Sequence, residues 1–393
     1  MKHRCRSAAV VSLILVAVCA AVVFARRYRP PPVRASNAVG DATCLSCHRE
    51  KASFEETAHR LTSQLPSRAA IEGSFSAGEN VLQTANPQLH YRMDSMARGY
   101  YETAVSGRAP DTTSQTARID IVTGVRKGQS YLYWQGDQLY QLPVSSWRGI
   151  GWINSPGYRD GVANFDRPIA PRCVECHATR LEPVADARRT NRYRLTSTML
   201  GIGCETCHGA GRMHAARERS PLRVVPTAVL SSAIINPARF SRGQRLDACA
   251  LCHAGLGTLK TPAFSFLPGQ RLEQHLDLPM PTFGGTPDVH GNQLELLIRS
   301  RCFQKSQMTC ATCHNVHETQ RDVASLSGRC LSCHTVQSCG LYPERGNALV
   351  GRCVDCHMPL EPSNVIISSH NGQREQPLVR THWIRVYPRT IGR

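Results

Sequence analysis

Seven copies of the pattern Cys-x-x-Cys-His dominate this 393-residue sequence and take up most of its 18 cysteines. In each copy the two thiols point the same way on a short turn, so they can bond both vinyl groups on one edge of a porphyrin. The adjacent imidazole then lies under the iron and takes one axial position. The pattern therefore predicts seven covalently attached haems c. The thioether cysteines are Cys44, Cys47, Cys173, Cys176, Cys204, Cys207, Cys249, Cys252, Cys310, Cys313, Cys330, Cys333, Cys353 and Cys356, and the proximal ligands are His48, His177, His208, His253, His314, His334 and His357.

Cys-x-x-Cys pairs also occur in zinc ribbons and in thiol-disulfide sites. Neither of these sites requires a histidine directly after the second cysteine. Histidine accounts for only 16 of the 393 residues, yet it follows every one of the seven pairs. Haem attachment is therefore the interpretation that the sequence favours.

Composition fits a chain built around cofactors. Only 6% of the residues are aromatic, so we expect stacked porphyrins to replace much of the usual side-chain core. The expected fold is a mainly α and irregular multihaem cytochrome c fold organised around stacked haems, with a small antiparallel β insert near residues 115–145. Haem c is attached outside the cytoplasm, which also suits a cysteine-rich chain.

The formal net charge of +18 resembles a nucleic-acid signal. Residues 1–36 supply seven of these positive charges and no acid, and the propionates of each haem add negative charge to the rest. We therefore interpret the remaining arginines as propionate partners. No nucleic-acid partner is expected.

The N-terminus has the pattern of an export signal. Lys2, Arg4 and Arg6 precede an uncharged run, residues 7–25, whose helical length of about 28 Å approaches a bilayer core of about 30 Å. We expect a retained signal anchor, and a cleaved signal peptide is the alternative. Residues 1–36 would then form this segment and a Pro-rich linker, and the rest of the chain would lie on the periplasmic side of the cytoplasmic membrane.

The remaining chain divides by its motifs. Residues 37–110 form a first haem segment, residues 171–260 carry haems two to four, and residues 261–393 carry haems five to seven. Between them, residues 111–170 contain an alternating pattern around Gln135-Gly136-Asp137 that predicts a β-hairpin. This insert serves as a scaffold, a partner-docking surface or the wall of an active site.

Histidines outside the motifs are candidate sixth ligands. His59 follows its own motif by a helical stretch and is better placed to reach a neighbouring haem. His214 and His317 follow His208 and His314 so closely that the chain could not round the rim of the same porphyrin. Eight such histidines follow the membrane segment, so every haem can be bis-His and closed, or one can be five-coordinate and open.

Two further cysteines lie in the exported part. Cys302 and Cys339 are 37 positions apart. In an oxidising compartment we expect a disulfide between them, which would stabilise the fold by roughly 4 kcal/mol on the loop-entropy model.

Several local runs together resemble the cytochrome c-552/c-554 family of multihaem cytochromes. They are Cys44 to His48 followed by Phe54, Thr57, Ala58 and His59; Cys204 to His208 followed by Gly-Ala-Gly and His214; Cys310 to His314 followed by His317; and Cys353 to His357 followed by Met-Pro. The resemblance implies distal ligation by His59, His214, His317 and His382. Matches at His290, His275 and His370 are weaker, and the first two rank ahead of His370. Ala210 stands where members usually have Pro.

The predicted function is electron transfer between redox partner proteins by a periplasmic heptahaem cytochrome c with bis-His haems. The alternative is a multihaem oxidoreductase that acts on a small nitrogen or sulfur compound at one five-coordinate haem. The sequence lacks the Cys-x-x-Cys-Lys motif of pentahaem nitrite reductases and has fewer haem motifs than hydroxylamine oxidoreductases. We therefore expect an electron-transfer protein rather than an enzyme with its own substrate. A structural haem-wire subunit of a larger complex would share these features.

Overall fold

The computed structural model describes residues 37–185, 189–220, 234–278, 285–370 and 372–388. Within these ranges no helix is both long and apolar enough to cross a membrane. The expected signal anchor, residues 7–25, lies outside them.

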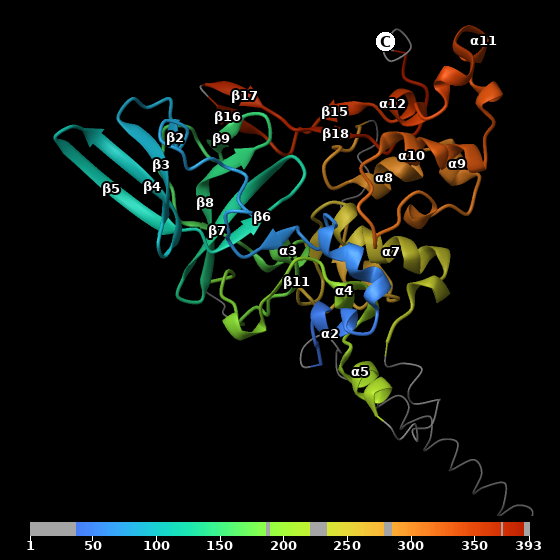
Figure 1. The fold of residues 1–393 in the computed structure, drawn as a ribbon, viewed down its shortest axis with the longest axis horizontal. Coiled ribbons are helices and arrows are strands. Elements are labelled where there is room, and N and C mark those ends of the chain that lie inside the picture. Colours follow the sequence, from blue (N-terminus) through green and yellow to red (C-terminus); the bar gives the residue numbers. More distant parts are fainter. Residues whose placement is uncertain (1–36, 186–188, 221–233, 279–284, 371, 389–393) are drawn as a thin grey trace, which may run out of the picture.

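Strands and helices occupy different parts of the molecule, with the strands gathered at one end and the helices at the other (Figure 1). The strand-rich end contains two antiparallel sheets. One sheet has the order β1-β6-β7-β8-β10 with β9 also paired to β8, and consists of β1 (Ser63–Gln64), β6 (Ile121–Thr123), β7 (Gly128–Gln135), β8 (Gln138–Trp147), β9 (Gly151–Asn154) and β10 (Arg167–Pro168). The other has the order β2-β3-β4-β5 and consists of β2 (Val81–Gln83), β3 (Leu89–Met96), β4 (Gly99–Arg108) and β5 (Asp111–Arg118).

The two sheets share an apolar core. β3 alternates in burial, so that Leu89, Tyr91 and Met93 point inward, as expected for a strand with one buried face. They belong to a buried cluster that includes Tyr131 and Trp152. Burying a large apolar side chain contributes roughly 1.5–3 kcal/mol, so this end of the molecule has a conventional protein core.

The prediction of a mainly α fold with a small β insert is wrong. Strands paired in the two sheets run from residue 63 to residue 168, well beyond 115–145, and further antiparallel pairs lie elsewhere in the described ranges. Strand β5 shows why the pattern was missed. Only Ala117 among its residues is buried, so the sequence of β5 carries no apolar alternation.

The helical end consists of short helices, most of them a single turn or two. They are α2 (Asp41–Leu45), η1 (Arg49–Glu56), α3 (Pro171–Glu175), η2 (Leu195–Ser197), α4 (Cys204–His208), α5 (Arg212–Arg219), η3 (Pro237–Arg239), α7 (Arg242–His253), η4 (Leu272–Gln274), α8 (Gln293–Ile298), α9 (Arg301–Gln304), η5 (Cys310–Thr312), α10 (Val323–Gly328), η6 (Cys330–Ser332), η7 (Val336–Ser338), α11 (Tyr342–Arg345), η8 (Gly346–Leu349) and α12 (Cys353–His357). Helix α7 is the longest of the helices in the described ranges and begins at a capping box of Ser241 and Gln244.

Among the described residues there are also four small two-stranded sheets. They pair β11 (Ala178–Arg180) with β12 (Met199–Leu200), β13 (Thr258–Leu259) with β14 (Leu276–Asp277), β15 (Leu360–Pro362) with β18 (Leu378–Arg380), and β16 (Ser368–His370) with β17 (Gln373–Glu375). The last two form an excursion of the C-terminal chain. It leaves α12, reaches the strand-rich end and returns.

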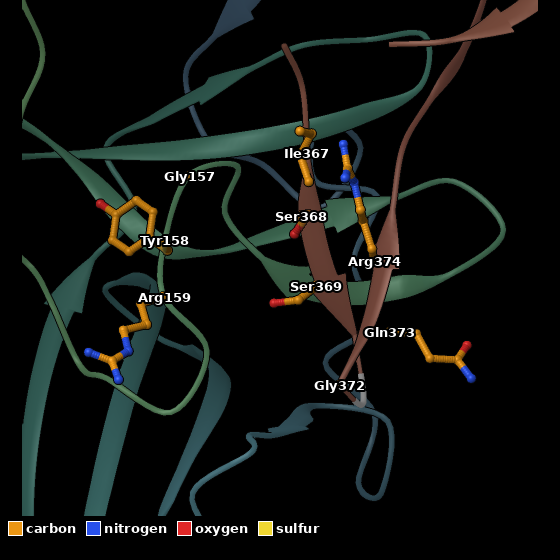
Figure 2. Close-up of a pocket in the computed structure, with 9 residues that line it drawn as sticks. All are labelled: Gly157, Tyr158, Arg159, Ile367, Ser368, Ser369, Gly372, Gln373 and Arg374. Carbon is orange, nitrogen blue, oxygen red and sulfur yellow. The ribbon is translucent and has the colours of Figure 1, made fainter. Parts of the chain in front are cut away.

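The β16–β17 hairpin is fastened to β9. The Asn154 side-chain amide donates to the Ser369 carbonyl at 3.2 Å and to its hydroxyl at 3.3 Å. A cleft of about 440 Å³ separates this hairpin from the loop around Tyr158 (Figure 2). None of the residues that line the cleft belongs to a Cys-x-x-Cys-His motif.

Candidate haem-binding sites

The Cys-x-x-Cys-His motifs are built on single helical turns. The His48 N–H donates to the Cys44 carbonyl at 2.9 Å, and His314 and His334 make the same bond to Cys310 and Cys330. This bond closes a helical turn between the first cysteine and the histidine. The turn holds the two thiols and the imidazole in a fixed relation, as attachment to one porphyrin requires.

Four motif histidines face a second histidine from a distant part of the chain. His48 faces His214 with ring centroids 6.3 Å apart, and His208 faces His317 at 6.2 Å. His253 faces His59 at 6.2 Å, and His314 faces His382 at 6.3 Å. The distal candidates that the resemblance implied are therefore each brought to a proximal histidine of another motif.

The four separations fit an iron atom between the rings. A metal ion bound at about 2 Å from one nitrogen of each imidazole holds the two ring centroids roughly 6 Å apart. Direct ring stacking would bring the rings closer, and a direct hydrogen bond would show as a short nitrogen-to-nitrogen contact. The donor set also fits haem, since paired imidazoles are common axial ligands of haem iron.

The second ring nitrogen of several motif histidines is held by the protein. The Nδ1 atom of His208 lies 2.9 Å from the Ile235 carbonyl, and that of His357 lies 2.9 Å from the Arg385 carbonyl. Because a carbonyl only accepts, Nδ1 carries the proton and Nε2 is left free to bind a metal. Such outer partners orient metal-binding histidines in general.

Burial favours the neutral, metal-binding form of these imidazoles. It lowers the pKa of His59 to about 4, with a contribution from His253. It also lowers the pKa of His382 to about 4, helped by His314. Metal binding requires neutral histidine, so these two residues are prepared for it.

Backbone contacts fix the position of His382. The Ser300 hydroxyl donates to the His382 carbonyl at 3.2 Å and accepts from the Ile384 N–H at 2.8 Å. Ser300 is fully buried. A single hydroxyl therefore bridges the two sides of Trp383 and fixes the backbone directly after the residue that faces His314.

The motifs also lie against one another. Hydrogen-bonding contacts join the thiols of Cys44 and Cys204, Cys176 and Cys252, Cys249 and Cys310, and Cys330 and Cys353. In the haem-loaded protein these sulfurs would be thioethers, so what matters here is their proximity. Each contact joins two different motifs.

The remaining candidates differ in their surroundings. Burial lowers the pKa of His177, and the nearby His290 adds to this effect. His290 thus lies near His177 of the second motif, and it also acts on His253 of the fourth. His370 belongs to β16, and its buried Nδ1 atom has no partner in the described residues. His334 is exposed in the sixth motif.

His275, ranked as a distal candidate from the sequence, lies in a buried polar cluster. Its Nε2 atom is 3.3 Å from a Glu175 carboxylate oxygen, and its Nδ1 atom contacts the Thr261 hydroxyl. Both ring nitrogens thus have protein partners, and neither is free for iron. In our assignment His275 therefore supports the second motif rather than binding metal.

Glu175 is a site residue that sequence reasoning missed. Burial alone would raise the pKa of this carboxyl, but hydrogen bonds from His275 and the Phe264 N–H, with the Arg172 charge, hold it below its ordinary value. Glu205 has a similar place in the third motif, where its carboxylate accepts from the N–H groups of Val39, Gly40 and Gly211. In these two motifs the sequence offered one signal, an acidic residue between the two cysteines.

The disulfide expected between Cys302 and Cys339 is not formed, and both are free thiols. Cys302 interacts electrostatically with Cys313 and Cys330, whereas Cys339 interacts with Cys353. Each cysteine is thus placed beside a haem motif instead of beside the other. The separation in sequence gave no information on this placement.

Comparisons with known proteins agree with the motifs. The family model described as "Cytochrome c554 and c-prime" matches residues 159–209, which include the second and third motifs. A C-type polyheme cytochrome, OmcC, of Geobacter sulfurreducens is 25% identical over 266 residues, covering 56% of this chain and 32% of that protein. The chain thus spans about a third of the length of this curated relative.

Among solved structures, an undecaheme cytochrome from the S-layer of Carboxydothermus ferrireducens is similar with a TM-score of 0.42 and 16% sequence identity. The alignment covers 93% of this chain and 54% of that one. The sequence matches and the repeated motifs together support a multihaem c-type cytochrome.

Proposed function

We propose that this chain is a seven-haem cytochrome c that transfers electrons one at a time between redox partner proteins. Its haems would be attached at the seven motifs and closed by a second histidine on the distal side. Iron would supply the one-electron chemistry, and the chain's own residues would position the haems and tune their potentials.

The observation that carries this proposal is the set of four facing histidine pairs. Their separations of 6.2–6.3 Å leave room for an iron atom and for nothing larger between the rings. A haem held in this way has no open position for a substrate. The pairs therefore favour electron transfer over the oxidoreductase alternative at the first, third, fourth and fifth motifs, and we assign His290 to the second.

The thiol contacts support an order for the electron path. They join the first motif to the third and the fourth to the fifth. They also join the sixth motif to the seventh and place the second beside the fourth. Weaker electrostatic interactions of Cys249 with Cys207 and of Cys313 with Cys333 link the third motif to the fourth and the fifth to the sixth. The proposed path runs 1-3-4-5-6-7, with haem 2 as a branch at haem 4.

The proposed setting is the periplasmic side of the cytoplasmic membrane. Haem c attachment and the cysteine content support export. Retention by residues 7–25 is part of the same proposal and rests on the sequence alone. The electron donor and acceptor would be redox proteins that dock near the ends of the path.

Electron paramagnetic resonance of the oxidised protein tests the proposal. We expect the paired haems to be low-spin and unchanged by nitrite or hydroxylamine, and the reduced protein not to bind carbon monoxide at them. His317→Ala should convert one haem to high spin while all haems stay attached, because it removes the ring that faces His208.

His275→Ala is the matched control, because this ring is held by Glu175 and Thr261 instead of facing a motif histidine. Its spectrum should remain fully low-spin. A wild-type haem that is high-spin and binds the added ligands would favour the oxidoreductase. An unchanged spectrum in His317→Ala would remove that residue from the ligand set.

A further inference from the structure

A buried charge pair lies between the second and the fourth motif. Arg172 directly precedes the first cysteine of the second motif, and Glu175 stands between its two cysteines. The Arg172 Nη1 atom donates to a Glu175 carboxylate oxygen at 3.1 Å, and the two side chains are 10% and 0% exposed. Because water is excluded, the field of each charge reaches its surroundings with little screening.

Arg172 contacts both motifs. Its Nη1 atom lies 3.2 Å from the Cys176 sulfur, and its Nε atom donates to the Leu256 carbonyl at 2.6 Å. Its Nη2 atom donates to the carbonyls of Leu251, in helix α7, and of Gly255, just beyond the end of that helix. The guanidinium therefore lies between the second motif and the end of the helix that carries the fourth.

The Glu175 carboxylate is held from its other side. One oxygen accepts from the Phe264 N–H at 2.6 Å and lies 3.3 Å from the Nε2 atom of His275. Phe264 has a φ of 65°, in the left-handed region that bulky residues rarely adopt. Such backbone strain persists only where the surrounding structure fixes it. The carboxylate is therefore kept in one place, with a donor directed at it.

Both charges act on sulfur atoms of the two motifs. Arg172 and Glu175 each interact electrostatically with Cys176 and with Cys252, in opposite senses. In the haem-loaded protein these sulfurs would be thioethers at the rims of haems 2 and 4, so the same charges would act on both irons. Reduction adds one negative charge to a haem, so a nearby cation favours it and a nearby anion opposes it.

We propose that Arg172 and Glu175 set the reduction potential of haem 2, and to a smaller extent that of haem 4, by nearly cancelling each other's charge. This inference rests on the proposed function, since it requires a haem at both motifs. The larger effect belongs to haem 2, because Arg172 contacts Cys176 directly. With either charge alone, haem 2 would bind an electron too strongly or too weakly for ready exchange with haem 4.

The seventh motif offers a similar pair that is open to water. Asp355 stands between its two cysteines at the same position as Glu175 in the second motif, and it pairs with Arg380 at 2.7 Å. The Asp355 side chain is 40% exposed, whereas that of Glu175 is fully buried. Because solvent screens an exposed charge, Asp355 provides a matched control at the same place in a motif.

Redox titration of the haem-loaded protein, followed by electron paramagnetic resonance of the individual low-spin signals, measures these effects. Glu175→Gln removes the negative charge and leaves Arg172, so it should favour reduction of one haem about tenfold, a positive shift of about 59 mV for a one-electron couple. Arg172→Gln should shift the same haem to a lower potential, because Glu175 then acts alone. The double variant should return to nearly the wild-type potential.

Asp355→Asn is the control and should shift its own haem much less. The opposite signs of the two single variants separate a charge effect from loosened packing, because entry of water stabilises the more highly charged ferric haem and lowers the potential in every variant. Haem content and spin state report separately on the proposed function and should match the wild type in Glu175→Gln. A Glu175→Gln variant with unchanged or lowered potentials would overturn the proposal, whether or not Arg172→Gln folds.

Discussion

Burial favours the neutral form of individual imidazoles, which is the form that binds iron. The pKa values of His59 and His382 are lowered to about 4 by desolvation and by the neighbouring histidine that each one faces. These two histidines come from opposite ends of the described chain, and burial is the main cause of the lowered pKa in both. Both stay neutral at physiological pH in the folded protein.

These lowered pKa values make stability depend on pH. Above the ordinary histidine pKa of 6.5, both rings are neutral in the folded and in the unfolded chain. Between 6.5 and about 4, only the unfolded chain takes up the protons, so the free energy of unfolding falls as the pH falls. Because iron also binds only neutral imidazole, ligation acts in the same direction.

We therefore expect the urea midpoint of the oxidised protein to decrease from pH 6.5 to pH 4, with high-spin haem appearing over the same range. Urea titrations followed by haem absorption at a series of pH values measure both effects. The region above pH 7 is the internal control, since neither ring titrates there. A midpoint that stays constant down to pH 4 would contradict this account.

Residues far apart in sequence show what could and what could not be expected from the sequence. The motifs and the candidates His59, His214, His317 and His382 were identified from local spacing and resemblance, because attachment to haem imposes a local pattern; the structure brings the four candidates to motif histidines, and ligation of iron stays a prediction. The partners of Glu175 could not be predicted, since Phe264 and His275 reach it only through the folded chain. The same applies to the placement of Cys302 and Cys339.

At the scale of elements, the strand-rich end was underestimated because its edge strands lack alternation. Strand β5 is exposed along nearly its whole length, and β1 and β10 have two residues each. Periodicity reports one-sided burial, so it detected the hairpin around Gly136 and gave no signal at β5. The alternation of β3 was present in the sequence but lay outside the predicted insert. These strands are stabilised by pairing with other strands, which the local sequence does not reveal.

Glu102 of strand β4 is buried between the sheets. Burial raises the pKa of this carboxyl well above its ordinary value, and only the Val144 N–H opposes the shift. Its Oε1 atom has no partner in the described residues. Because the folded pKa is raised, the stability present below the unfolded pKa of 4.5 is lost as the pH rises above it.

Glu102→Gln should therefore stabilise the strand-rich end at pH 7 and have little effect at pH 4, where the carboxyl is protonated in both states. Denaturant titrations followed by tryptophan fluorescence report on this end through Trp152, which lies in the same core. Glu79→Gln, at an exposed position, is the control and should show no such difference between the two pH values. A Glu102→Gln variant that is less stable than the wild type at pH 7 would show that the charged form is favoured.

For the whole molecule, the proposed path combines the four thiol contacts with the electrostatic interactions of Cys249 with Cys207 and of Cys313 with Cys333 into one connected series with a branch. Contacts between Cys44 and Cys204 and between Cys330 and Cys353 lie at its two ends. The proposed haems would thus form one electronic unit in spite of the long strand-rich insertion between the first and second motifs.

A reductive titration tests the number of haems in this unit. We expect seven electrons to be taken up per polypeptide, one for each motif, and the absorption of the reduced haems to increase in proportion. Quantitation of haem in the same sample after denaturation in pyridine is the control. A count of six or fewer would show that at least one motif is not loaded.

The facing histidine pairs also constrain the order in which the molecule is made. His48, His208 and His314 face rings that follow them in the chain by 166, 109 and 68 positions, whereas His253 faces His59, which precedes it. An N-terminal haem attached during export would have to wait for a later segment to emerge before its iron could be closed. The cytochrome would then mature as an interlocked whole, and a nascent chain would carry exposed, reactive iron until its last ligands arrive.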